Sequence, residues 1–354
     1  MADRRPPDRP ATLKDVAAAA GVSIATASKA LRGGYKVRAD TRGRVERAAA
    51  ALRFTPTRLD ANRPHGRSGT VGLITHDLEG RFSIPVMMGA EDAFGTGGIQ
   101  AFLCDARGDA KKEREQVRAL LARRVDGFIV VGDTTNPRPS LGRDLRVPVV
   151  YAYSPSADPT DISVVSDGYG AGRLAIEHLL DSGRRRIAYV AGDPSFAAAV
   201  DRAAGAGEAM ASRGLQFVGG GPFFGDWTEA WGRRETRRLL ASDTEIDAIA
   251  CGADQLARGV LDALRETGRR VPTDIAVMGH DDWRHIATQA RPPLSSISMD
   301  LEELGRLAAR LLFTAIDGGG GAGVHVVPTR LVVRGSTAPA PAPEVQLPAT
   351  GRRP

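Results

Sequence analysis

The chain has 354 residues, of which 42% are hydrophobic, so it is long and apolar enough for about two to three domains with cores of their own. Its apolar runs fall short of the roughly 20 residues of a membrane span, and its polar start, MADRRPPDRP, is unlike a signal peptide. We therefore expect a cytoplasmic protein with no membrane partner. Cys104 and Cys251 are far apart and the six histidines lack metal-ligand spacing, so we expect no disulfide framework, metal site or cofactor.

The charge is distributed unevenly along the chain. Residues 1–68 contain 15 Lys and Arg against 6 Asp and Glu, whereas residues 69–354 contain 33 against 36. The basic excess therefore lies entirely in the first fifth of the sequence. This asymmetry predicts a nucleic-acid-binding head attached to a body that does not bind nucleic acid.

After a basic lead, residues 1–10, that we expect to be disordered, residues 12–31 predict two short helices separated by a tight turn. Thr12 and Asp15 form an acidic variant of the capping box, Gly21 ends the first helix, and Ser23 caps the second. The apolar residues have helical spacing and predict a buried face; they are Leu13, Val16, Ala17, Ala20, Ala27, Ala30 and Leu31. Residues 40–52 resume helical spacing, which makes residues 11–58 a three-helix head.

The other face of the second helix is left free for a partner, and its residue types suit duplex DNA. Methyl groups and a long basic side chain can reach base edges in the major groove, whereas hydroxyls near a helix start suit phosphates. We assign Ile24, Ala25 and Lys29 to base edges, and assign to phosphates Thr12, Thr26, Ser28, Arg32 and Thr41. The alternative is an alanine-rich helical hairpin that only packs on itself.

The order TLKDVAxxAGVSxATxSxxL resembles the N-terminal signature of the LacI/GalR family of bacterial transcription regulators. The resemblance implies a homodimer that binds double-stranded operator DNA and responds to a small-molecule effector. It also implies a hinge at residues 59–68 that places a leucine in the minor groove. Here Arg63 stands at that position and Pro64 follows it, so we expect an electrostatic minor-groove contact and weaker DNA kinking.

From residue 70 onward, strands alternate with helices, which predicts parallel, doubly wound sheets. We expect strands near 71–77, 99–106, 126–133, 147–154, 186–192, 247–252 and 275–278, and helices at 87–94, 111–124, 171–180, 205–212 and 257–267. The resemblance implies that residues 69–337 form two lobes of periplasmic-binding-protein type that bind the effector and dimerise. Residues 338–354 are rich in alanine and proline and are expected to be disordered.

Ligands of doubly wound sheets bind beyond the carboxyl ends of the strands, so polar and aromatic residues at those ends are the effector-site candidates. They are Asp77, Phe82, Asp167, Trp227 and Asp281, and the family resemblance adds Arg202, which stands in the family's R-x-x-G position. Phe82 and Trp227 could form apolar platforms for a sugar ring, while Asp167, Arg202 and Asp281 could bind its hydroxyls. The alternatives are that the tryptophan lies in the core, that Asp167 only caps a helix, and that Arg202 belongs to a salt bridge.

One departure weakens a simple sugar assignment, because Ala253-Asp254 stands where many members of the family have an Asn-Asp pair. No HExxH, GxSxG or Walker motif appears, and residues 168–172 are a weak dinucleotide signal, so we do not predict an enzyme. We predict a DNA-binding transcription regulator, acting as a repressor, controlled by a small molecule of the sugar class. The alternative is a sugar-binding receptor or a carbohydrate-related enzyme without specific DNA binding.

Overall fold

A computed structural model describes residues 11–31, 37–54, 67–76, 81–95, 99–242 and 245–338. The chain divides into two compact units, Met1–Gly69 and Thr70–Pro354, which we call the head and the body. The expected lead, nearly all of the expected hinge and tail, and the candidate residues Arg32, Arg63 and Asp77 lie outside the described residues. Among the described helices, none is long and apolar enough to cross a membrane.

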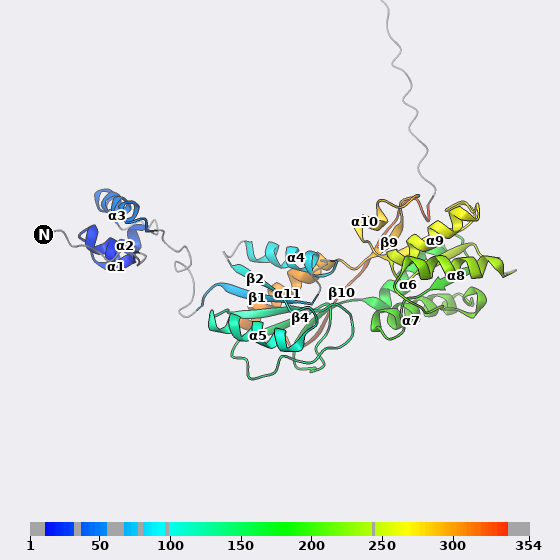
Figure 1. Cartoon of the computed structure of the whole chain (residues 1–354), viewed down its shortest axis with the longest axis horizontal. Coiled ribbons are helices and arrows are strands. Elements are labelled where there is room, and N and C mark those ends of the chain that lie inside the picture. Colours follow the sequence, from blue (N-terminus) through cyan, green and yellow to red (C-terminus); the bar gives the residue numbers. More distant parts are fainter. Residues whose placement is uncertain are drawn as a thin grey trace, which may run out of the picture. The chain divides into compact units, whose positions relative to one another are not determined.

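The head contains the three predicted helices, α1 (Leu13–Ala19), α2 (Ile24–Leu31) and α3 (Ala39–Ala51) (Figure 1). The Thr12 backbone N–H donates to Asp15 Oδ2 at 2.8 Å, and the Asp15 N–H donates to Thr12 Oγ1 at 3.4 Å, so the predicted capping box is present. Gly21 has a φ of 62° in the turn, and the Thr26 N–H donates to Ser23 Oγ at 3.1 Å. Local sequence signals therefore fix both ends of the turn.

The small apolar side chains of the three helices form the core of the head. Its buried members are Val16, Ala17, Ala20, Ala27, Ala30, Val45 and Ala49. Alanine at most of these positions lets the helix backbones approach closely. The core uses one face of α2 only, so the opposite face remains exposed.

The first lobe of the body is built on a six-stranded parallel sheet in the order β10-β5-β4-β3-β1-β2. Its strands are β1 (Thr70–Thr75), β2 (Gln100–Asp105), β3 (Gly127–Val131), β4 (Val149–Ala152), β5 (Ile162–Ser166) and β10 (Gly323–Val327). Helices α4 (Ser83–Gly95) and α11 (Leu301–Ile316) cover one face, and α5 (Ala110–Ala122) covers the other. Neighbouring residues such as Leu73 and Ile74 enter opposite cores, as the two-residue period of a strand requires.

The second lobe is built on a five-stranded sheet in the order β11-β9-β8-β7-β6. Its strands are β6 (Ile187–Val190), β7 (Ala248–Cys251), β8 (Ala276–Asp281), β9 (Ser295–Ser298) and β11 (Arg330–Val332). One face packs against α6 (Gly168–Asp181) and α7 (Ala197–Ser212), and the other against α8 (Glu229–Ala241) and α9 (Asp254–Glu266). The short η2 (Val218–Gly220) and α10 (Arg284–Ala287) complete the lobe.

The predicted doubly wound architecture is confirmed, with several differences in detail. The last strand, β11, pairs antiparallel with β9, so the second sheet is not purely parallel as expected. Helices α8, α10 and α11 and strands β9, β10 and β11 were not among the predicted elements. Helix α7 begins at Ala197, eight residues before its predicted start, and already buries Ala198, Ala199 and Ala203 in its first half.

Three helix pairs of the body meet through glycines on both partners. A Cβ at Gly205 of α7 would lie 2.0 Å from the Tyr169 carbonyl oxygen of α6, and one at Gly172 would lie 1.9 Å from the Arg202 carbonyl oxygen. The pairs α4/α11 and α8/α9 have the same reciprocal arrangement at Gly89/Gly305 and Gly232/Gly259. Backbone contact between these helices therefore depends on the absence of a side chain.

Candidate effector and DNA-binding sites

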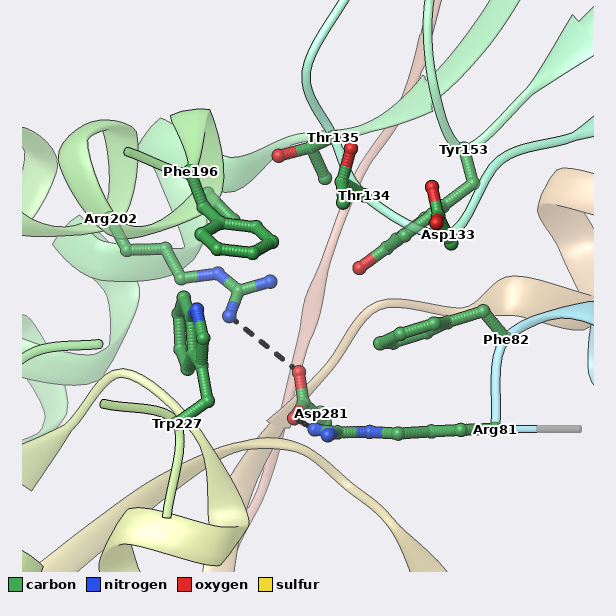
Figure 2. A pocket seen from close by; sticks show the side chains of 11 residues that line it. Arg81, Phe82, Asp133, Thr134, Thr135, Tyr153, Phe196, Arg202, Trp227 and Asp281 are labelled. Carbon is green, nitrogen blue, oxygen red and sulfur yellow. Dashed lines mark hydrogen bonds and ion pairs between the residues drawn. The ribbon is translucent and has the colours of Figure 1, made fainter. Parts of the chain in front are cut away.

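A cavity of about 180 Å³ lies beyond the carboxyl ends of the strands and between the two lobes of the body (Figure 2). The first lobe lines it with residues that precede α4 or follow β3 and β4, namely Arg81, Phe82, Asp133, Thr134, Thr135 and Tyr153. The second lobe contributes Phe196, Ala198, Arg202, Trp227 and Asp281. This is the position that the doubly wound topology favours for a ligand.

Four of the six predicted effector residues meet in this cavity: Phe82, Arg202, Trp227 and Asp281. Asp167 does not line it. Its Oδ1 accepts a hydrogen bond from the Gly170 N–H at 2.7 Å and caps α6. The structure therefore agrees with the alternative that Asp167 caps a helix. Asp77 lies outside the described residues.

Aromatic rings from both lobes form the apolar walls of the cavity (Figure 2). Phe82 stacks on Tyr153 in the first lobe with centroids 4.5 Å apart, and Phe196 meets Trp227 edge to face at 6.0 Å in the second. Flat rings of this kind can pack against the C–H face of a sugar or against a planar ring.

Arg202 is the buried cation of the cavity, and its side chain projects from α7. It is 4% exposed, its Nη1 donates to the Gly252 carbonyl oxygen at 2.7 Å, and the same atom lies 3.6 Å from Asp281 Oδ1. Burial lowers the pKa of Arg202, and the neighbouring Tyr153 and Tyr189 partly offset this effect. Arg202 is thus one end of a buried ion pair and at the same time a wall of the cavity.

His280 stands beside this pair and is fully enclosed. Burial, together with the positive charges of Arg202 and Arg81, lowers the pKa of His280 well below its usual value. The ring is therefore neutral at neutral pH. Its Nδ1 lies 3.0 Å from Asp281 Oδ1, and a neutral ring that carries its proton on Nδ1 can donate to that carboxylate.

Two residues of the cavity have positive φ angles, which residues other than glycine rarely adopt. Asp281 has a φ of 104° at the end of β8, and Tyr153 has a φ of 71° just after β4. Such conformations cost about 1–3 kcal/mol each and concentrate at functional sites. Here they place one carboxylate and one ring at the facing edges of the two sheets.

Polar contacts join the lobes on two sides of the cavity. Arg81 of the first lobe forms an ion pair with Asp281 and donates from Nη1 to Gln255 Oε1 at 2.8 Å. Asn136 of the first lobe accepts from the Ala197 N–H at 2.7 Å and donates to the Ser195 carbonyl oxygen at 3.0 Å. These contacts hold the lobes together around the cavity.

The sequence interpretation missed several lining residues: Arg81, Asp133, Thr134, Thr135, Tyr153, Phe196 and Ala198. Asp133 and Tyr153 lie at or next to the carboxyl ends of the predicted strands 126–133 and 147–154, so the rule that selected Asp281 could have found them. Arg81 and Phe196 precede helices in irregular connections, and no periodic signal marks them.

The head presents its candidate DNA contacts on α2 and near α1 and α3. Ile24 is 49% exposed, and Ala25 and Lys29 are also exposed, as base-reading residues must be. Thr12, Thr26, Ser28 and Thr41 are half-buried, and the Thr26 and Ser23 hydroxyls lie 2.9 Å apart. The hydroxyl of Thr26 is thus shared with the turn.

A helix-turn-helix head and a two-lobed body that encloses a cavity define a DNA-binding regulator with a small-molecule binding domain. Residues 12–57 match the family described as bacterial regulatory proteins, lacI family, and residues 176–337 match the periplasmic binding protein-like domain. The chain belongs to the LacI family of transcription regulators, and the resemblance noted in the sequence is confirmed.

Relatives and solved structures match over nearly the whole chain. The HTH-type transcriptional regulator CelR of Thermobifida fusca is 34% identical over 335 residues, which cover 92% of this chain and 98% of CelR. The lac repressor dimer bound to operator and the anti-inducer ONPF matches with a TM-score of 0.74 at 28% identity, over 93% of this chain and 99% of that one. The CelR–cellobiose complex matches with a TM-score of 0.61 at 33% identity, over 92% and 99%.

Proposed function

We propose that this chain is a homodimeric repressor whose affinity for operator DNA is controlled by a sugar bound between the lobes of its body. The observation that carries the proposal is the cavity, because it combines aromatic walls with a buried guanidinium and a carboxylate. Aromatic faces suit the C–H surface of a sugar ring, and charged groups suit its hydroxyls. As a regulator of transcription, the protein would act in the cytoplasm, where bacterial chromosomes lie.

The relatives support this choice of ligand. A structure of CelR holds cellobiose, and CelR shares about a third of its residues with this chain over almost its full length. Ala253 is buried at the N-terminal end of α9 and offers no side-chain hydrogen bond, so any hydroxyl contact there must come from other residues. Asp133, Thr134 and Thr135 of the first lobe are available for that role.

On DNA, we assign Ile24, Ala25 and Lys29 to base edges and the half-buried hydroxyls of Thr12, Thr26, Ser28 and Thr41 to phosphates. Two heads on a pseudo-palindrome add their contacts, because one short helix reads few bases. Arg32 in the head and Arg63 in the expected hinge remain proposed contacts from the sequence alone.

We place the dimer contact on exposed apolar side chains of the first lobe. Ile84 and Met88 project from α4, and Phe102 and Leu103 from the edge strand β2, and all four are nearly half exposed. Several exposed apolar side chains on one lobe indicate an interaction surface. We take a second copy of the chain as the partner, because a pseudo-palindromic operator binds two heads. Met88→Glu should turn the dimer into a monomer in light scattering, whereas a dimer of unchanged stability would place the interface elsewhere.

The DNA assignment is tested by comparing two lysines of the head. Lys29→Ala should reduce affinity for the operator more than affinity for random DNA, because Lys29 is assigned to a base. Lys14→Ala removes the same charge from an exposed position on α1 and should weaken binding to both DNAs alike. Equal losses on both DNAs for Lys29→Ala, measured by fluorescence anisotropy, would contradict the assignment.

The effector is identified by titration calorimetry of the full chain with mono- and oligosaccharides, followed by an operator gel shift with each sugar that binds. A sugar that binds and changes operator affinity supports the proposal. If a purine or another metabolite gave binding heat and no sugar did, the effector would belong to that class of metabolite and the sugar assignment would be wrong. Chemical turnover of the bound molecule would instead favour a carbohydrate-related enzyme.

A further inference from the structure

We propose that Arg81 fills one end of the effector cavity and thereby determines which ligands fit, restricting the site to a single ring. The inference deepens the proposed function and rests on it for the nature of the ligand. That Arg81 occupies this end of the cavity, however, does not depend on the identity of the ligand and can be tested without any sugar.

The Arg81 guanidinium lies between two aromatic rings that belong to different lobes. Its central carbon is 5.0 Å from the centroid of Phe82 and 4.9 Å from that of Trp283, which precedes α10. Phe82 in turn stacks on Tyr153, so a continuous stack runs from the first lobe through Arg81 to the second. A guanidinium within about 6 Å of an aromatic centroid is attracted to that face, and Arg81 meets this condition at both rings.

The two terminal nitrogens of the guanidinium bind polar groups of the second lobe. Arg81 pairs with the Asp281 carboxylate (Figure 2). It also donates to Gln255 Oε1 at 2.8 Å, and its side chain is only 19% exposed. A carboxylate, an amide oxygen and two aromatic faces are the groups that a binding site offers to a flat, polar ring. Arg81 therefore uses the contacts that a second sugar ring would need.

The size of the remaining cavity agrees with this arrangement. Its volume of about 180 Å³ is well below the roughly 300–1,000 Å³ of sites for drug-sized ligands. A ligand that extends from the cavity toward Trp283 must displace Arg81 and break its contacts with Asp281 and Gln255, which join the lobes. Arg81 thus excludes longer ligands in two ways. It occupies the space that a second ring would take, and it must lose contacts that join the lobes before such a ligand can bind.

The occupancy is tested with methylguanidinium as a substitute for the missing side chain. Arg81→Ala should leave a slot lined by Phe82, Trp283, Asp281 and Gln255 that binds low-millimolar methylguanidinium, detected by saturation-transfer NMR. The wild-type chain and Arg81→Met should not bind it, because the arginine or the methionine fills the slot. Arg143→Ala is the matched control, since Arg143 is an exposed arginine of the same lobe, paired with Asp158.

The effect on specificity is tested by calorimetry with glucose and cellobiose. Arg81→Ala should improve cellobiose binding relative to glucose by about tenfold or more, whereas Arg81→Met should keep the wild-type preference. Wild-type protein that binds cellobiose at least as tightly as glucose, or Arg81→Ala that binds no methylguanidinium, would overturn the inference. If neither sugar binds any variant but methylguanidinium binds only Arg81→Ala, the occupancy stands and the sugar assignment fails.

Discussion

Asn136 of the first lobe accepts a hydrogen bond from the backbone N–H of Ala197, the first residue of α7 in the second lobe, at 2.7 Å. The residue at the N-terminal cap of α7, Phe196, provides no capping side chain of its own. One lobe therefore caps a helix of the other. This helix also carries Arg202, so the contact links lobe closure to the placement of the buried cation in the cavity.

Asn136→Ala should shift the ligand-free body toward separated lobes. It removes two hydrogen bonds across the cleft, each contributing about 0.5–1.5 kcal/mol. Small-angle scattering should show a larger radius of gyration for the variant. Asn136→Asp keeps the acceptor for the Ala197 N–H but loses the donor to the Ser195 carbonyl. Its radius of gyration should therefore lie between those of the wild type and Asn136→Ala. An Asn136→Ala profile that coincides with the wild-type profile would show that other contacts hold the lobes together.

Two glycines of α7 should respond in opposite ways to the same substitution. Gly205→Ala places a Cβ against the Tyr169 backbone of α6 and should lower the free energy of unfolding by about 1–3 kcal/mol. Apart from the adjoining turns of its own helix, Gly207 has no atom within 4 Å of the position a Cβ would take, so Gly207→Ala should stabilise the helix by up to about 1 kcal/mol. Chemical denaturation of both variants checks the pair, and equal effects would mean that α6 and α7 can separate freely.

The features that the sequence predicted correctly depend on local chemistry. The capping box of Thr12, the left-handed Gly21 and the apolar face of α2 are specified within a few residues of each other, and the structure has all three. The strand-end rule likewise selected Phe82 and Asp281, which line the cavity, whereas Arg202, which projects from α7, was selected through the family resemblance. Each strand of a doubly wound sheet points its carboxyl end at the same edge, so the rule needs only the strands.

The features that the sequence did not predict depend on how the two lobes meet. Arg81 finds Gln255 and Asp281 at sequence separations of 174 and 200 residues, and Asn136 finds Ala197 at 61. No periodicity marks such partners. Asp167 is the opposite case: it was selected as an effector-site candidate but does not line the cavity. A carboxylate at a strand end can also cap the helix that follows, and Asp167 does so. Only the spatial arrangement separates these two roles.

The capping box of α1 should measurably stabilise the head. Thr12→Ala removes the hydroxyl that accepts from the Asp15 N–H and should lower the local stability of α1 by about 1 kcal/mol, whereas Thr12→Ser retains the acceptor. Hydrogen exchange of the α1 amides in the full chain measures this effect directly. Faster exchange in Thr12→Ser than in Thr12→Ala would contradict the capping role. Exchange in α9 of the body serves as the internal reference.

Asp254 should make the stability of the body depend on pH. Burial raises its pKa to about 7, although hydrogen bonds from the Ser296 hydroxyl at 2.7 Å and the Trp283 N–H at 2.6 Å oppose the shift. The folded chain therefore holds a proton that the unfolded chain releases above its ordinary pKa near 4. The resulting stabilisation is complete below about pH 4 and is lost as the pH rises to about 7.

Asp254→Asn removes this titration, so the stability of the variant relative to wild type should rise by up to about 4 kcal/mol between pH 4 and pH 7, at 1.36 kcal/mol per pKa unit. His280 also titrates in the unfolded chain within this window, but it is present in both proteins and its contribution cancels. Asp144→Asn, at an exposed position, should follow the wild-type profile. Urea denaturation at several pH values gives the comparison, and parallel profiles for Asp254→Asn and wild type would show that Asp254 is ionised throughout.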